Sequence, residues 1–401
     1  MEQICTKSAL KRQREQSEVA DIFRLYGKQY RSTHRVSYEQ KKVMGHIQVC
    51  RSAALGGHIE QCNRCGLERN AYNSCRDRHC PKCQTLVKEQ WLNDRRAEVL
   101  PCGYFHLVFT LPHKVNPIIL SNKRITLNIL FTAVNETLQA FAKDPKWHLQ
   151  GKLGFIAVLH TWSQKLIDHF HLHCLIPAGV LSFTKDNWIP ANESFLFRVE
   201  SLAKEFKKRY LDYLATAYRK GELIFPGNTA RFESPQGFAQ LLESLLEATW
   251  IAYAKRPFAG PEQVLEYLGR YTHRVAITNN RIISILNGKV TFTYRDRQDN
   301  NKIKPMDLPA DEFIGRFLLH VLPRGFMKIR YFGFLAHTNK RKAVALIRRL
   351  LGVDTSVEKT KETIPEMMLR LTGADITCCP RCKKGTMTVI KKLPRHYYDS
   401  S

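Results

Sequence analysis

The chain has 401 residues, 44% of them hydrophobic, which is enough for two or three domains with sizeable cores. Lys and Arg number 63 against 36 Asp and Glu, and the net charge of +27 predicts a polyanionic partner, with nucleic acid as the first choice. We find no apolar run of about 18 residues that would span a membrane and no signal peptide. We therefore expect a cytoplasmic protein, in which the 12 cysteines are metal ligands or free thiols rather than disulfides.

Residues 1–45 are predicted to form a helical N-terminal arm. Val19, Ile22, Phe23 and Tyr26 recur at i, i+3, i+4 and i+7, which is the spacing of one helix face. Such a helix could dock on a core or face DNA, and the sequence leaves both open.

Residues 46–100 contain two Cys-x2-Cys pairs, which predict a zinc-binding module that contacts DNA. Cys62 and Cys65 form the first pair, and Cys80 and Cys83 form the second. These four thiolates suffice for one tetrahedral Zn²⁺, and four more candidate ligands would suffice for a second ion. We therefore expect one or two structural zinc ions. The additional candidates are Cys50, His58, Cys75 and His79.

Residues 101–338 are predicted to form an α+β catalytic domain. A strand at residues 104–111 is followed by helical spacing from about 117 to 143, and then by a strand at 155–159 that runs into a histidine-rich stretch. The sequence Asn287-Gly288 lies between two further strand-like runs and predicts a hairpin turn. This order of elements favours a mainly antiparallel sheet.

The sequence His171-Leu172-His173 is a candidate metal site, because residues two apart on a strand share one face. Taken alone, the motif is more often the polar face of a half-buried strand. A metal needs a third protein ligand, and Gln164 is preferred because an amide oxygen suits Mg²⁺ or Mn²⁺. His160 is the alternative third ligand, and it would favour softer metals.

Tyr267 and Tyr271 are candidate nucleophiles on a helix predicted to begin near Gly260-Pro261. They lie at i and i+4, on one helix face together with Arg270 and Arg274. A buried tyrosine stripe is the ordinary explanation of such spacing, but two guanidinium groups suit a surface that binds phosphate. With a metal and arginines beside it, a tyrosine can attack a phosphodiester and form a covalent phosphotyrosine.

Residues 339–401 form a basic C-terminal region with a possible zinc knuckle. Cys378, Cys379 and Cys382 provide three thiols, and His396 is the one nearby candidate for a fourth ligand.

Several ordered motifs carry a family resemblance: Cys62–Cys65, residues 72–84, 109–113, 160–174 and 267–274, and Arg330-Tyr331-Phe332-Gly333. In these motifs, which cover roughly residues 45 to 340, the chain resembles the two-tyrosine HUH transposases of the insertion-sequence-91 type. These enzymes move DNA by rolling-circle transposition. One departure is Phe170, where relatives usually have proline.

The resemblance implies a zinc-binding N-terminal module and an HUH endonuclease domain with a ferredoxin-like antiparallel sheet. It implies cleavage of single-stranded DNA at the element ends and target through 5′-phosphotyrosine intermediates. His171 and His173 would hold Mg²⁺ or Mn²⁺, and Tyr267 and Tyr271 would be the nucleophiles. Residues expected to contact DNA are Arg270, Arg274 and Arg330.

The expected partners are single-stranded DNA in the bacterial nucleoid and a host helicase or the replication machinery, because the chain has no phosphate-binding Gly-x4-Gly-Lys-[Ser/Thr] loop of its own. The oligomeric state is left open. Two alternatives are kept. One is a plasmid replication initiator or relaxase with the same HUH chemistry, and the other is a zinc protein that binds DNA without catalysis.

Overall fold

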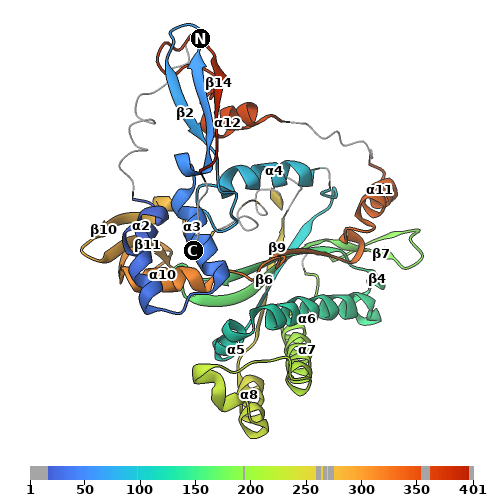
Figure 1. Cartoon of the computed structure of the whole chain (residues 1–401). Coiled ribbons are helices and arrows are strands. Elements are labelled where there is room, and N and C mark those ends of the chain that lie inside the picture. Colours follow the sequence, from blue (N-terminus) through green and yellow to red (C-terminus); the bar gives the residue numbers. More distant parts are fainter. Residues whose placement is uncertain are drawn as a thin grey trace.

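The computed structural model describes residues 17–96, 98–192, 195–258, 263–264, 269, 275–353 and 362–396. At its centre is a five-stranded sheet in the order β13-β5-β6-β3-β9, in which every neighbouring pair is antiparallel (Figure 1). The predicted α+β class with a mainly antiparallel sheet is confirmed at this level. The strands are β3 (Tyr104–Thr110), β5 (Phe155–Trp162), β6 (Asp168–Pro177), β9 (Ile251–Phe258) and β13 (Ile329–Phe332).

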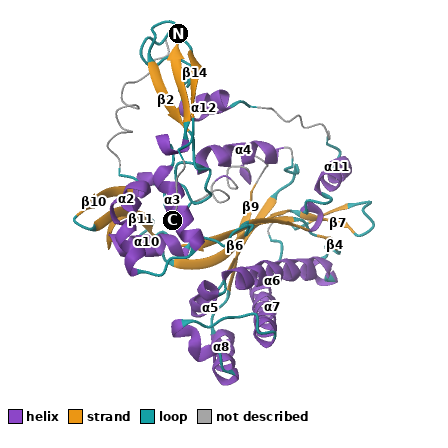
Figure 2. Ribbon diagram, in the orientation of Figure 1, coloured by secondary structure: helices purple, strands orange, loops and turns teal. Residues whose placement is uncertain are grey.

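One face of the central sheet is covered by helices and is called here the helical face. Ala157 of β5 pairs with Cys174 of β6, and the side chains of both strands on this side are buried in the largest hydrophobic cluster. Figure 2 shows the covering helices gathered on one side of the sheet. They are α5 (Asn116–Ser121), α6 (Lys123–Lys143), α7 (Val199–Arg219) and α8 (Pro235–Glu247).

The opposite face, called here the histidine face, carries Ile156, Val158 and Leu175. These side chains pack in a second cluster with residues of α4 (Gln84–Arg96) and α11 (Lys340–Leu350). Because both faces are covered, the strands are rich in apolar residues without the alternation of a half-exposed sheet. Polar side chains on this face are therefore held in a largely buried setting.

A third cluster joins the N-terminal helices to a small sheet. Phe23 contacts Phe317 with ring centroids 5.3 Å apart, and Val19 and Ile22 are buried beside it. The predicted helix face is confirmed, and it docks on a core. Asn287 and Gly288 both have positive φ, at 49° and 74°, as the predicted hairpin turn requires. The elements are α2 (Val19–Thr33), α3 (Tyr38–Val49), β10 (Ile282–Leu286), β11 (Lys289–Asp296), β12 (Lys302–Pro309) and α10 (Ala310–Leu319).

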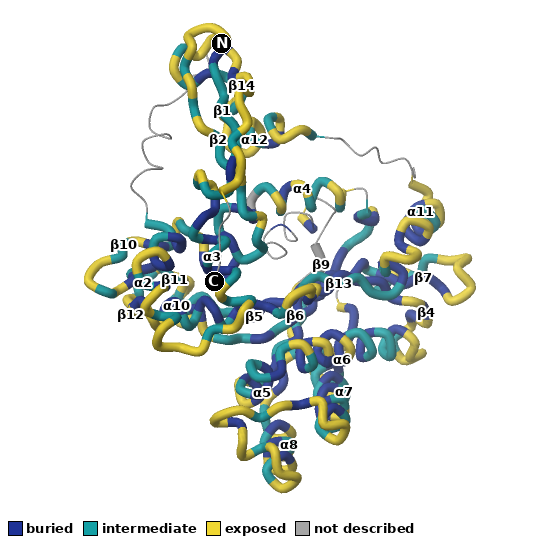
Figure 3. The backbone as a smooth tube through the Cα atoms, viewed as in Figure 1, coloured by how far each residue is buried: buried dark blue, intermediate teal, exposed yellow. Residues whose placement is uncertain are grey.

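A three-stranded sheet extends from the body of the molecule and is called here the ribbon (Figure 1). Its central strand β1 (Gly57–Cys62) pairs with β2 (Glu68–Tyr72) on one side and with β14 (Met387–Leu393) on the other. Much of the ribbon surface is exposed (Figure 3). The short helix α12 (Ile364–Thr372) precedes β14. The C-terminal region therefore returns to the N-terminal cysteine module.

A further small sheet contains β4 (Gly151–Lys152), β7 (Gly179–Ser182) and β8 (Trp188–Pro190). Within the described ranges, no helix is both long and apolar enough to cross a membrane. The predicted divisions at residues 1–45, 46–100, 101–338 and 339–401 stay predictions. Two contacts join residues of different predicted divisions: α2 packs on α10, and β14 pairs with β1.

Candidate active site and metal centres

Three histidines meet on the histidine face of the central sheet. His160 of β5 is the direct pairing partner of His171 of β6, and His173 lies two residues further along the same strand. Residues paired across an antiparallel ladder share a face, as do residues two apart on one strand. The three imidazoles therefore project together, with ligand nitrogens within 4.8 Å of one another. This spacing allows them to hold a single metal ion.

Gln164, the preferred third ligand in the sequence, lies in a different setting. Strand β5 ends at Trp162, after a register irregularity that follows His160. Gln164 is in the turn that leads to β6, where its backbone carbonyl accepts a 2.5 Å hydrogen bond from Arg281. The prediction that Gln164 continues the strand face of His160 is wrong. The alternative ligand, His160, is the residue that lies with His171 and His173.

Hydrogen bonds made by Nδ1 orient two of these histidines, His171 and His173. His171 donates from Nδ1 to the carbonyl of His169 at 2.9 Å, which leaves Nε2 as the nitrogen with a lone pair. Nδ1 of His173 lies 2.9 Å from Nε2 of His106, a buried residue of β3. Burial, and then the charge of Lys255, lower the pKa of His106 to about 3. His106 is therefore neutral near pH 7, and its Nε2 can accept a hydrogen bond from Nδ1–H of His173.

His106 was not among the candidate residues identified from the sequence. A signal was present, because His106, Val108 and Thr110 alternate along β3 and share a face with the paired His173. The alternation identifies His106 as a neighbour of His173 only once the pairing of β3 with β6 is known. A lone histidine in an apolar strand is otherwise a common buried residue.

The two tyrosines and their arginines, Tyr267, Arg270, Tyr271 and Arg274, lie outside the described residues. Val264 and Gly269, two residues of the same stretch, are described. Val264 is fully buried in the cluster that covers the histidine face. A Cβ added to Gly269 would lie 2.8 Å from Cδ1 of Leu92 on α4. Both contacts are on the side of the sheet that carries the three histidines.

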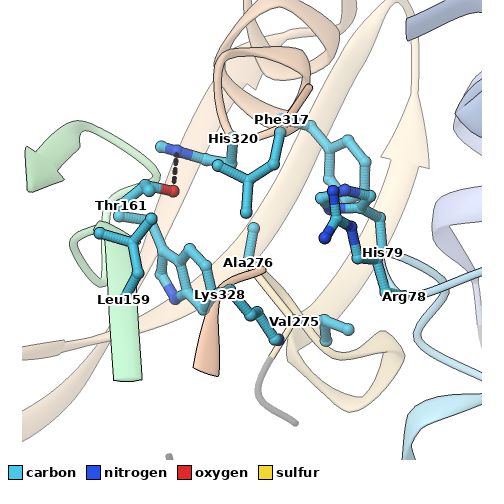
Figure 4. Close-up of a pocket in the computed structure, with 11 residues that line it drawn as sticks. Arg78, His79, Leu159, Thr161, Val275, Ala276, Phe317, His320 and Lys328 are labelled. Atoms are coloured by element: carbon cyan, nitrogen blue, oxygen red, sulfur yellow. Dashed lines mark hydrogen bonds between the residues drawn. The ribbon is translucent and has the colours of Figure 1, made fainter. Parts of the chain in front are cut away.

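Val275 and Ala276, which follow the tyrosine segment, line a small pocket at the end of β5 (Figure 4). Trp162 lines the same pocket, and its ring stacks on that of His160 with centroids 5.3 Å apart. Figure 4 also shows the hydrogen bond between Thr161 and His320. Val275 and Ala276 therefore line the same pocket as Trp162, whose ring contacts that of His160.

Arg330, an expected DNA contact, is not brought to this cluster. It pairs with Ala157 on β5 and so lies on the helical face. Its guanidinium lies 4.0 Å from the ring centroid of Phe131 and donates a 2.6 Å hydrogen bond to Asn128. A contact of Arg330 with DNA stays a prediction.

The cysteines form two separate groups of four. The first contains Cys50, Cys75, Cys80 and Cys83, and the sulfur of Cys83 lies 3.5 Å from those of Cys50 and Cys75. Hydrogen bonds from Cys75 and Cys80 lower the pKa of Cys50 to about 7, and those from Cys50 and Cys75 hold the pKa of Cys83 far below its usual range. The donating thiols of Cys75 and Cys80 have raised pKa values. The four sulfurs lie close enough to one another to share a single metal ion.

The second group contains Cys62 and Cys65 together with Cys379 and Cys382 from the C-terminal region. The prediction that Cys62 and Cys65 share one ion with Cys80 and Cys83 is wrong. Strand β1 has six residues and spans about 20 Å. It places the first pair at the tip of the ribbon and the second at its base.

Neither predicted histidine ligand joins a cysteine group. His58 lies on β1, where its Nε2 is 3.1 Å from a carboxylate oxygen of Glu60. His79 lines the pocket of Figure 4, and its burial lowers its pKa to about 3. Both groups of four are composed of cysteine alone.

Two family models match the chain. "Putative transposase" matches residues 154–343, and "Transposase zinc-binding domain" matches residues 22–111. "Putative transposase y4qJ" from Sinorhizobium fredii is 47% identical over 93% of this chain and 95% of the relative. The chain belongs to the transposases of the insertion-sequence-91 type.

A second relative, "Transposase for insertion sequence element IS801" from Pseudomonas savastanoi pv. phaseolicola, is 26% identical over 72% of this chain and 68% of the relative. No solved structure matches. The transposase is thus an enzyme that acts on DNA. The zinc-binding model includes all of Cys50, Cys75, Cys80 and Cys83, which supports a structural zinc ion in the first group.

The buried His320 predicts an acid-sensitive step in the stability of this transposase. Burial lowers its pKa from 6.5 to about 4, against the opposing hydrogen bond to Leu166. As the pH falls below 6.5, the unfolded chain takes up a proton that the folded chain does not, and stability decreases until the pH reaches about 4. The loss attributable to this residue is on the order of 2 kcal/mol at about pH 5.

Urea unfolding of the wild type and of His320→Gln at about pH 7 and about pH 5 measures this contribution. The decrease in unfolding free energy should be about 2 kcal/mol smaller in the variant. His34→Gln, at an exposed position, is the matched control and should retain the full decrease. Equal decreases in the wild type and in His320→Gln would contradict the assignment.

Proposed function

We propose that this transposase cuts and rejoins single-stranded DNA at the element ends by metal-assisted tyrosine attack, in a rolling-circle mechanism of the HUH class. One observation carries the proposal. Three histidines meet on one face of the central sheet, and the described residues around Tyr267 and Tyr271 pack on that same side. The proposal therefore expects the two candidate nucleophiles to lie near the three histidines.

His160, His171 and His173 would hold the divalent ion. Three imidazole nitrogens suit Mn²⁺ or another transition metal better than Mg²⁺, which prefers oxygen ligands. A bound ion would act as a Lewis acid on the scissile phosphate and orient it for attack. The hydrogen bonds of His171 to His169 and of His173 to His106 would keep both rings in the orientation that the ion requires.

In the proposed reaction the phenol oxygen of one tyrosine forms a bond to phosphorus, and the bond between phosphorus and the 3′-oxygen breaks. The phenol proton is lost to solvent, and the departing oxygen takes up a proton to become a 3′-hydroxyl. The 5′-phosphate stays linked to the tyrosine, so a later attack by a 3′-hydroxyl can rejoin the strand. Arg270 and Arg274 would bind the phosphate.

Two tyrosines would allow one cut end to be held while a second strand is cut. The substrate would be single-stranded DNA of the element ends and of the target, supplied by a host helicase or by replication. Membership of a transposase family favours this function over a replication initiator, a relaxase or a non-enzymatic zinc protein. Cleavage confined to element ends would distinguish the proposed transposase from a replication initiator and from a relaxase.

The decisive experiment tests for a covalent intermediate. Full-length protein, Mn²⁺ and single-stranded oligonucleotides from the element ends should give a protein–DNA adduct that survives denaturation, because a phosphotyrosine bond is covalent. Tyr267→Phe with Tyr271→Phe should abolish it, and either single substitution should retain part of it. Tyr38→Phe, at an exposed position on α3, is the matched control.

Two results would count against the proposal. If folded wild-type protein gives no adduct on any end sequence, tyrosine-mediated cleavage is excluded. If the adduct persists in the double variant, another nucleophile is responsible.

The third metal ligand can be tested by comparing His160→Ala with Gln164→Ala. His160→Ala should raise the Mn²⁺ concentration that gives half-maximal adduct by at least about tenfold, since even residues outside the ligand set change affinity by that factor. Gln164→Ala should leave it unchanged, because Gln164 lies in the turn after β5. The reverse pattern would restore Gln164 as the ligand.

His106 is expected to act as a positioning residue through its hydrogen bond to His173. His106→Phe should raise the Mn²⁺ requirement about tenfold, and saturating Mn²⁺ should restore the adduct rate. His106→Gln keeps a hydrogen-bonding group and should retain part of the affinity. A loss that saturating Mn²⁺ does not restore would indicate a purely structural role.

A further inference from the structure

The ribbon contains a second group of four cysteines that is drawn from the two ends of the chain. Cys62 and Cys65 lie at the end of β1, and Cys379 and Cys382 lie shortly before β14. Cys62 and Cys382 are 320 residues apart in sequence, yet their sulfurs are 3.7 Å apart. The sulfurs of Cys65 and Cys379 are 3.6 Å apart.

The two Cys-x2-Cys segments adopt the same local conformation. Gly66 N–H donates to the carbonyl of Cys62 at 3.1 Å, and Lys383 N–H donates to that of Cys379 at 3.0 Å. Gly66 and Lys383, each directly after the second cysteine, have positive φ values of 69° and 55°. A left-handed backbone conformation is costly for lysine. Lys383 adopts it at the position equivalent to Gly66, which indicates that the turn is required.

Backbone N–H groups point at the sulfurs in both segments. Arg64 and Cys65 donate to Sγ of Cys62 at 3.4 and 3.5 Å, and Gly385 donates to Sγ of Cys382 at 3.3 Å. Such bonds stabilise negative charge on sulfur, which is the form that coordinates metal. A Cβ at Gly385 would collide with the sulfur of Cys62, so glycine permits the close approach.

The two segments are also bonded directly to each other. Asn63 N–H donates to the carbonyl of Thr386 at 3.1 Å, and Thr386 N–H donates to Oδ1 of Asn63 at 2.9 Å. The hydrophobic cluster here is very small, with Cys62, Cys379 and Met387 as its buried members. A module with so little apolar burial ordinarily needs a metal or disulfides to be stable.

The sulfur spacing favours a metal over disulfides. Four sulfurs held about 2.3 Å from a tetrahedral zinc ion lie about 3.8 Å from one another. The distances of 3.6 and 3.7 Å are close to that value, whereas a disulfide requires about 2.05 Å. An all-thiolate set also suits zinc better than a hard cation.

We propose that Cys62, Cys65, Cys379 and Cys382 bind a second structural Zn²⁺ that fastens the C-terminal strand β14 to β1. The zinc-binding module then includes residues from both ends of the chain, and its C-terminal part lies outside the segment matched by the zinc-binding family model. The site closes the ribbon at its tip, and the first cysteine group lies at its base. This proposal is independent of the tyrosine mechanism.

Zinc content per chain tests the proposal in the full-length protein. The wild type should contain about two zinc ions, and Cys379→Ser with Cys382→Ser should contain about one. Cys62→Ser with Cys65→Ser should also contain about one. Cys378→Ser is the matched control, because Cys378 adjoins the group without belonging to it, and it should keep both ions.

Hydrogen exchange gives a second measurement. Amides of β14 should exchange faster in the Cys379→Ser, Cys382→Ser variant than in Cys378→Ser, because the metal no longer holds the strand. If that variant does not fold, replacement of zinc by Co²⁺ in the wild type provides the count, and two tetrathiolate ions per chain are expected. One ion in the wild type, two in the double variants, or disulfides that link these cysteines would overturn the proposal.

Discussion

The pairing register of β5 and β6 is the constraint on which the candidate active site depends. It places His160 directly opposite His171, and a slip of one residue would move every histidine of one strand to the other face. The register is held from the helical face, where Leu159 pairs with Leu172 and both are buried. The apolar residues that alternate with the histidines therefore determine where the histidines point.

Burial on both faces of the sheet determines the protonation state of His106 at the candidate active site. Helices α5 to α8 cover one side of β5 and β6, and α4, α11 and Val264 cover the other side. In this setting His106 stays neutral, since desolvation lowers its pKa. A neutral imidazole can accept a hydrogen bond from His173, so His106 would help to hold this proposed metal ligand in place.

The cysteine groups bear on the stability of the ribbon. The ribbon has three short strands and little apolar burial, so its own side chains offer little to offset the entropy of ordering. Two groups of four cysteines lie at its two ends, and each brings a Cys-x2-Cys pair together with cysteines from elsewhere in the chain. With zinc bound as proposed, the ribbon would be tied at its base to the helical body, through Cys50 at the end of α3, and at its tip to the C-terminal strand.

The sequence by itself determined the features that depend on local patterns. Helical spacing identified the buried face of α2, the Asn-Gly pair identified the hairpin, and the His-Leu-His pattern identified two residues on one face of a strand. The antiparallel α+β class followed from the order of such elements. Each of these depends on residues within a few positions of one another, whose geometry the helix or strand period dictates.

Only the tertiary structure decided which distant residues meet. The choice of His160 over Gln164 depended on where β5 ends, which its alternation of side chains does not reveal. The contribution of His106 depended on β3 pairing with β6, and the grouping of Cys62 with Cys382 depended on β14 pairing with β1. Contacts across hundreds of residues are selected by packing and strand register over the whole chain, so no local spacing could have specified them.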